Sequence, residues 1–248
     1  MGAPSPRAAE APGAEASAAA AAAVRAQFRA DKAALLESFA EARASAPAAA
    51  RLVRQLAQLA DTTLGSLWKA ARMPESAALL AVGGYGRGEL YPYSDVDVLV
   101  LLPVNSGAAD SGATAAVERF ITSCWDAGLE IGSSVRSIAE CLDEARRDVT
   151  VQTALLESRC LCGAKPTCVA LTAAVTGAMD ARQFLSAKMA EMRQRHLKYE
   201  DTPYSLEPNC KESPGGLRDL QVILWVARAA GLGRNWEIGR ASCRERVW

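Results

Sequence analysis

Hydrophobic positions in the first third of the chain recur at steps of mostly three or four residues. Leu52, Leu56, Leu59 and Leu67 follow this spacing up to Trp68. Such a period places apolar side chains on one face of a helix and polar ones on the other. We therefore expect an amphipathic helix here that covers one side of the structure that follows.

The period then changes from helical spacing to short apolar or alternating runs. Residues 78–82 form an apolar run that ends at two glycines, and residues 94–103 alternate between two faces. Both patterns predict strands, the first of them buried. Residues 129–136 fit a third strand, which Gly132 interrupts. Further helices are expected at 117–125, at 137–147 and, between breaks at Pro and Gly, from 150 onward.

These elements predict an α+β fold, in which a small mixed sheet packs with helices and a helical extension follows. The expected divisions are a disordered low-complexity segment at 1–23, a sheet domain with its N-terminal helices at 24–165, and the helical extension at 166–236. Residues 237–248 resemble the translation of a sequencing-library adapter. We expect them to be foreign to the natural protein, which would then continue beyond Trp236.

The composition gives no support for a nucleic-acid partner, a membrane span or export. Lys plus Arg equals Asp plus Glu at 28 each, so no overall basic field indicates binding to nucleic acid. No apolar run approaches the ~20 residues of a membrane span, and no signal peptide is recognisable. The seven cysteines lack Cys-x-x-Cys spacing and are expected to be reduced thiols. We therefore expect a cytoplasmic protein without a membrane partner.

The candidate chemistry begins with Asp95 and Asp97, which are two residues apart on a predicted strand. Side chains at this spacing point to the same face, where two carboxylates repel each other unless a cation neutralises them. Magnesium suits such a pair, because it binds one or two carboxylates together with substrate phosphates. The pair predicts a magnesium site for displacement at phosphorus, with a solvated pair of edge-strand aspartates as the alternative.

A glycine turn before this strand predicts a site for phosphates. Gly83 and Gly84 close the preceding strand, and residues without side chains let backbone N–H groups approach an anion closely. Arg87 and Ser94 add a charge and a hydroxyl nearby. A dinucleotide-binding fingerprint is excluded because its sixth position is Glu89 here, and no Gly-Lys-Ser/Thr completes a P-loop.

The glycine turn and the aspartate pair together resemble the signature of the polymerase-beta-like nucleotidyltransferase superfamily. The longer string over residues 83–97 is similar to that of the protein-PII uridylyltransferases. The resemblance implies a nucleotidyltransferase fold and magnesium-dependent transfer of UMP from UTP to a tyrosine hydroxyl of the PII signalling protein, with release of pyrophosphate. Three further segments agree with that family, at 134–136, 150–159 and 206–220.

The resemblance also implies roles for individual residues. Asp95 and Asp97 would bind the metal ions, and the glycine turn would hold the phosphates. A third carboxylate commonly completes such sites; Glu130 on the third strand is our candidate, and Asp148 is the alternative. Ser133 stands where the family usually has histidine, which leaves the level of activity open.

The C-terminal part adds candidates of a different kind. Lys211 and Arg218 flank a Pro-Gly-Gly loop before a helix at 217–230 and are candidate phosphate contacts; a tight turn into the helix is the alternative. His196 is the only histidine, and we expect it on a solvated helix face. One histidine cannot build the phosphohydrolase metal site that the family usually carries, so we expect no UMP-removing activity.

Two other functions remain open at this point. One is transfer of AMP or another nucleotide to a different acceptor, because no residue in the sequence identifies the base. The other is nucleotide binding without catalysis. Aspartate substitutions and labelled nucleotides would separate both from uridylyl transfer.

Overall fold

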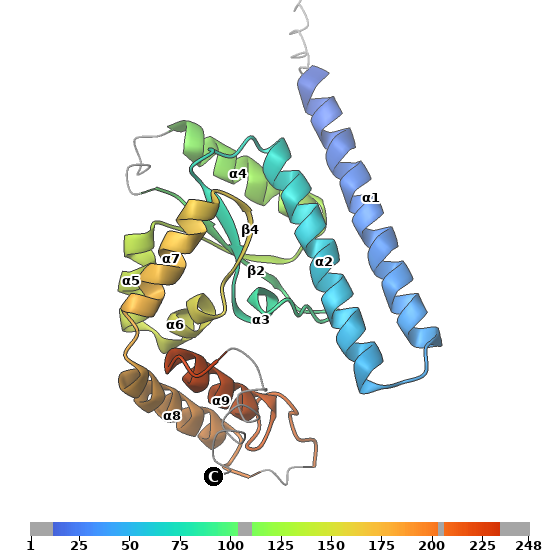
Figure 1. Cartoon of the computed structure of the whole chain (residues 1–248). Coiled ribbons are helices and arrows are strands. Elements are labelled where there is room, and N and C mark those ends of the chain that lie inside the picture. Colours follow the sequence, from blue (N-terminus) through green and yellow to red (C-terminus); the bar gives the residue numbers. More distant parts are fainter. Residues whose placement is uncertain (1–11, 104–110, 203–205, 234–248) are drawn as a thin grey trace, which may run out of the picture. The chain divides into compact units, whose positions relative to one another are not determined.

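The computed structural model describes residues 12–103, 111–202 and 206–233 and has an α+β architecture (Figure 1). A four-stranded mixed sheet has the strand order β3-β2-β1-β4. The predicted fold class is therefore confirmed. The strands are β1 (Ala78–Ala81), β2 (Val96–Leu101), β3 (Ile131–Arg136) and β4 (Arg159–Gly163).

Helices provide most of the remaining regular structure. Helices α2, α4, α5 and α9 lie at the predicted positions within a few residues, except that α2 and α4 extend further at both ends. The helices are α1 (Pro12–Glu41), α2 (Ala46–Ala70), α3 (Gly83–Gly86), α4 (Ser111–Asp126), α5 (Ile138–Arg147), α6 (Val149–Leu156), α7 (Lys165–Gly177), α8 (Ala181–Lys198) and α9 (Leu217–Ala229).

Helix α1 begins earlier than the composition led us to expect. It starts at Pro12, so residues 12–23 are helical although we expected disorder there. The run of alanines explains the difference, because alanine has the highest helix propensity of all residues. Residues 1–11, the rest of the expected low-complexity segment, and the adapter-like residues 237–248 lie outside the described part of the chain.

The chain forms two compact units, and each is described by itself. The first contains the described residues up to Val135 together with Arg159–Lys165; the second contains Arg136–Ser158 and the described residues from Pro166 onward. Residues 136–158, expected in the sheet domain, thus group with the helical extension. The reason is that α5 packs on α6, and α6 packs in turn on α8 and α9.

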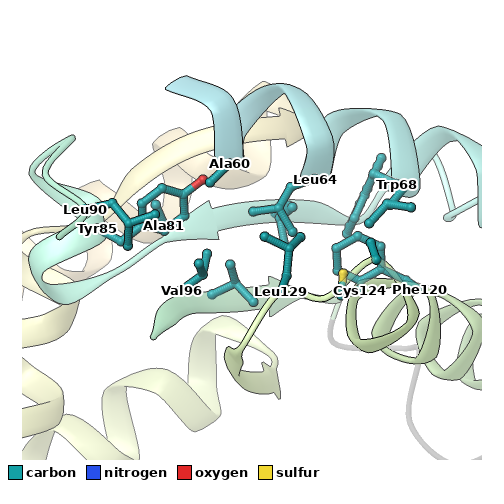
Figure 2. Packing of buried hydrophobic residues seen from close by; sticks show 14 of the residues in the cluster. Ala60, Leu64, Trp68, Ala81, Tyr85, Leu90, Val96, Phe120, Cys124 and Leu129 are labelled. Carbon is teal, nitrogen blue, oxygen red and sulfur yellow. The ribbon is translucent and has the colours of Figure 1, made fainter. Parts of the chain in front are cut away.

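The core of the first unit lies between α2, α4 and one face of the sheet (Figure 2). Ser45 caps α2 by accepting a hydrogen bond from the backbone N–H of Ala48. Leu64 of α2 is fully buried, and Trp68 meets Phe120 of α4 edge to face, with ring centroids 5.3 Å apart. The predicted amphipathic helix is therefore confirmed, and its apolar face covers the sheet that carries the glycine turn.

Strand β4 corrects the expectation that everything after residue 150 is helical. It pairs antiparallel with β1, which also pairs antiparallel with β2. Gly163 ends the strand with φ +86°, and a Cβ there would collide with the carbonyl oxygen of Ala77. A five-residue strand without clear alternation gives no period to detect, which is why the sequence pattern missed it.

The cysteines are not all reduced. Cys124, Cys141, Cys162 and Cys210 are free thiols, whereas Cys160 and Cys168 are disulfide-bonded. Cys160 lies on β4 and Cys168 on α7, and only residue 164 separates these two elements in the sequence. The expectation of reduced thiols throughout is wrong for these two, because it rested on the lack of Cys-x-x-Cys spacing, which does not report which cysteines meet in the fold.

The second unit has a smaller apolar cluster around Phe184, Val222 and Trp225. Phe184 comes from α8, and the other two come from α9. In neither unit does a helix of the described residues combine the length and hydropathy that crossing a membrane requires.

Candidate active site

The glycine turn follows directly from the end of the buried strand β1. Val82 is extended, and Gly83 then turns the chain with φ +58°, a conformation that favours glycine. The backbone N–H of Val82 donates to the carbonyl oxygen of Asp97 at 3.1 Å. This bond fixes the start of the turn to β2, so that the turn and Asp97 are neighbours in the fold.

The Asp97 carboxylate lies between two glycines. A Cβ at Gly83 would lie 3.6 Å from its Oδ2, and a Cβ at Gly132 on β3 would collide with its Oδ1. Asp97 is exposed, while Val96 and Val98 on either side of it are buried. Three elements therefore meet at one solvent-accessible carboxylate, and two of them approach it without a side chain.

Asp95 immediately precedes β2 and Glu130 immediately precedes β3, so neither lies within the strand expected for it. The backbone N–H of Val96 donates to the carbonyl oxygen of Glu130 at 2.8 Å. Both acidic residues are exposed and line one open hollow of about 590 Å³. Gly132 lines the same hollow, so the hollow reaches the position next to Asp97.

The alternative third carboxylate, Asp148, lies in the second unit and has a local structural role. Its side chain accepts a hydrogen bond from the backbone N–H of Thr150 at 2.6 Å and caps α6. Glu130 lines the same hollow as Asp95 within the first unit, whereas Asp148 belongs to the second unit. In the described ranges, no group of three or more His, Cys, Asp or Glu residues is arranged to hold a metal ion.

Arg87 and Ser94 lie on either side of the segment that joins the turn to β2. The Arg87 Nε donates to Glu89 at 3.0 Å, and one of its terminal nitrogens would be 3.5 Å from a Cβ at Gly84. Ser94 is exposed and lines a smaller hollow of about 100 Å³, together with Glu130. The guanidinium is therefore at the glycine turn, and the hydroxyl is beside the acidic residues.

A polar network joins the glycine turn to α2 and β4, and no sequence motif had indicated it. Arg159 of β4 donates to both oxygens of Asp61 on α2 at 2.8 and 3.0 Å, and the Tyr85 hydroxyl donates to the same carboxylate at 2.6 Å. Burial, and then the Asp61 hydrogen bond, raise the pKa of Tyr85 well above its usual range. The Asp61 hydrogen bond also raises the pKa of Arg159. The network ties the turn to both the helix and the edge strand.

The two C-terminal candidates, Lys211 and Arg218, lie in the second unit. Arg218 pairs with Glu212 at 3.2 Å, and its guanidinium carbon lies 5.5 Å from the centre of the Trp225 ring. The Lys211 residue is exposed, and its backbone N–H donates to Asn209. Arg218 therefore stabilises the loop and α9 of its own unit.

His196 is not on a solvated helix face as expected. Its Nε2 lies 3.0 Å from both carboxylate oxygens of Asp219, and the Arg195 guanidinium donates to the same carboxylate at 2.6 Å. Asp219 also accepts from the backbone N–H of Gly215. Burial raises the pKa of Asp219, but hydrogen bonds from Arg195, His196 and Gly215 outweigh it and hold that pKa below its usual value.

Comparison with known protein families finds two matching models. A nucleotidyltransferase domain matches residues 64–154, which include the glycine turn, both aspartates and Glu130. A model described as GlnD PII-uridylyltransferase matches residues 183–241. The two matches lie on either side of β4.

Curated relatives carry the name bifunctional uridylyltransferase/uridylyl-removing enzyme. One from Burkholderia orbicola is 56% identical over 212 residues, which is 86% of this chain and 24% of the relative. One from Cupriavidus pinatubonensis is 55% identical over 214 residues, with the same coverage. One from Ralstonia nicotianae is 58% identical over 185 residues, 75% of this chain and 21% of the relative. The chain spans about a quarter of the length of these relatives.

Proposed function

We propose that the chain transfers UMP from UTP to a tyrosine hydroxyl of a PII signalling protein in the cytoplasm. Over the quarter of their length that it spans, the chain belongs to the family of bifunctional uridylyltransferase/uridylyl-removing enzymes. One observation carries the proposal. The Asp97 carboxylate lies between Gly83 of the turn and Gly132 of β3, beside the hollow that Asp95 and Glu130 line.

We propose Asp95 and Asp97 as ligands of magnesium. The donor set fits this ion, because both residues are exposed carboxylates and magnesium takes one or two carboxylates with phosphate and water oxygens. A cluster of three protein ligands is therefore not required. When bound, the ion supplies neutralisation of the phosphate charge and of the charge that develops during in-line displacement.

The remaining steps use the chain's own residues. Gly83 and Gly84 give the triphosphate access to the backbone beside Asp97, with Arg87 and Ser94 as further nucleotide contacts. Glu130 accepts the proton of the acceptor hydroxyl, because its carboxylate lines the open hollow from which an acceptor can approach. The tyrosine oxygen then forms a bond to the α-phosphorus as the bond from that phosphorus to pyrophosphate breaks.

The test is label transfer to purified PII with magnesium and each labelled nucleoside triphosphate in turn. We expect transfer from UTP, and a fall of at least about 100-fold in both Asp95→Asn and Asp97→Asn, since each removes a charge-stabilising group from the site. Asp126→Asn is the matched control, because Asp126 is an exposed aspartate at the end of α4. Equal labelling by the site variants and the wild type would contradict the proposal, and transfer from ATP alone would replace uridylyl with adenylyl transfer.

Nucleotide binding without turnover is the second candidate function. Ser133 in place of the family's usual histidine favours it. UTP binding by the wild type without release of pyrophosphate would support this alternative. Asp97→Asn would then leave UTP binding unchanged.

A further inference from the structure

The open hollow beside the acidic residues has an unusual pair of side chains on its wall. Trp125, in the last turn of α4, is 59% exposed, and Arg29 of α1 is also exposed. Both line the hollow together with Asp95 and Glu130. Tryptophan and arginine are the residues that most often dominate the binding energy of protein interfaces, so their presence at this position indicates recognition of a partner.

The structure places the Arg29 side chain at the hollow with its charge available. Gly128 has φ +79°, and a Cβ at this residue would lie 3.8 Å from the Nε of Arg29. Arg25, one turn earlier on α1, pairs with Asp126. Arg29 makes no hydrogen bond or ion pair with any residue in the described ranges, so its guanidinium is not used to stabilise the fold.

The residues that line the hollow indicate that it binds the acceptor and not the nucleotide. Asp95 and Glu130 line it, but none of the glycine-turn residues 83–86 does, and neither does Asp97. The triphosphate is proposed at the turn. An in-line displacement needs the attacking oxygen opposite the leaving pyrophosphate, and this hollow adjoins both Asp95 and Glu130 without including the turn.

We infer that Trp125 and Arg29 form the acceptor-recognition surface of this enzyme. The indole ring packs against the protein segment that presents the tyrosine, and the guanidinium binds a carboxylate or carbonyl oxygen of that same segment. The identity of the acceptor rests on the proposed function. Because both side chains are exposed, removing either one changes recognition and leaves the fold of the unit intact.

Steady-state transfer by the whole chain tests this assignment, with PII varied at saturating UTP and UTP varied at saturating PII. We expect Trp125→Ala and Arg29→Ala each to raise the KM for PII about tenfold, the threshold expected of an interface anchor, and to leave the KM for UTP unchanged. Trp125→Phe should lie between wild type and Trp125→Ala, because it keeps an aromatic ring. Arg54→Ala, an exposed arginine of α2 that lines neither hollow, is the matched control.

A rise in the KM for UTP in place of that for PII would overturn the inference and assign the hollow to the nucleotide. Binding of PII without UTP, measured by calorimetry, separates the inference from the proposed function. If the wild type binds PII but transfers no UMP, the proposed function is contradicted. In that case, weaker PII binding by Trp125→Ala supports the acceptor-recognition surface. Wild type that transfers UMP while the variants bind PII equally well contradicts the surface alone, and absence of PII binding by the wild type contradicts it as well.

Discussion

At the scale of single residues, two glycines give the Asp97 carboxylate its space. A methyl group added by Gly132→Ala would collide with the Asp97 Oδ1. We expect this variant to displace the carboxylate and to reduce kcat/KM for UMP transfer by about 100-fold, as displacements of about 1 Å in active sites commonly do. Steady-state transfer to PII measures this effect.

Ser133→Ala is the control for Gly132→Ala. Ser133 follows Gly132 on the same strand and is also exposed, so its substitution tests whether any change on β3 reduces activity. We expect Ser133→Ala to keep most of the wild-type kcat/KM. If Gly132→Ala is as active as Ser133→Ala, the contact with Asp97 does not matter for the reaction.

The Asp61 carboxylate is the centre of the network behind the glycine turn. Asp61→Ala removes the partner of Arg159 and of the Tyr85 hydroxyl, both of which are partly or fully buried. We expect the free energy of unfolding to fall by about 2 kcal/mol, because hydrogen bonds to a charged group are lost and their donors remain. Urea denaturation measures it; Asp31→Ala, which loses only a hydrogen bond from Gln27, should cost less than about 0.5 kcal/mol.

The sequence could predict some of these residues but not others. Asp95 and Asp97 could be proposed from the sequence because their spacing is local. Glu130, expected on the third strand, lies one residue before β3. The contact of Asp61 with Arg159 joins residues 98 positions apart. No periodicity or motif within a short window contains such a contact, so the support of the turn became visible only in the structure.

At the scale of elements, prediction worked where a period was long enough to recognise. The apolar spacing of α2 runs over several turns, and β2 has a buried valine on each side of the exposed Asp97. Strand β4 has only five residues, and its partners on β1 are about 80 positions earlier. At the alanine-rich start of α1, disorder was predicted where the structure has a helix. Low sequence complexity was taken as disorder, although alanine favours helix.

Helices α8 and α9 are held together by Asp219, which gives the second unit a pH-dependent stability. Its pKa is lowered in the folded state by Arg195, His196 and the Gly215 backbone against the effect of burial. A carboxyl with a lowered folded pKa stabilises the fold above its unfolded pKa of about 3.9 and loses that contribution as the pH falls through the folded pKa. We therefore expect Asp219→Asn to lower the free energy of unfolding by about 2 kcal/mol at pH 7, and the difference from wild type to shrink below about pH 4.

Urea denaturation at a series of pH values between 7 and 3 measures this difference. Asp143→Asn is the control, because Asp143 forms an exposed ion pair with Arg146 three residues later on α5. Such pairs contribute less than about 1 kcal/mol. A constant difference between wild type and Asp219→Asn over the whole range would show that the charge of Asp219 does not contribute.

At the scale of the whole molecule, the sequence order and the compact units do not coincide. Residues 136–158 leave the first unit, and residues 159–165 return to it to form β4. Domains predicted as continuous stretches of sequence could not include β4 in the first unit without the residues before it. Its place there depends on pairing with β1, and the place of residues 136–158 depends on α6 packing against α8 and α9. The nucleotidyltransferase match over residues 64–154 also crosses this division, because it continues past Val135 into residues of the second unit.

Each unit has its own buried cluster, which predicts that core substitutions act within one unit. Leu64 of α2 is fully buried in the first cluster and Phe184 of α8 in the second. Truncating either side chain to alanine should cost about 3 kcal/mol, and amide hydrogen exchange reports opening of cooperative regions separately. We expect Leu64→Ala to speed exchange in α2, α4 and β1 but not in α8 and α9, and Phe184→Ala to do the reverse. Each variant is the control for the other. Faster exchange in both units from either substitution would show that the chain unfolds as one cooperative structure.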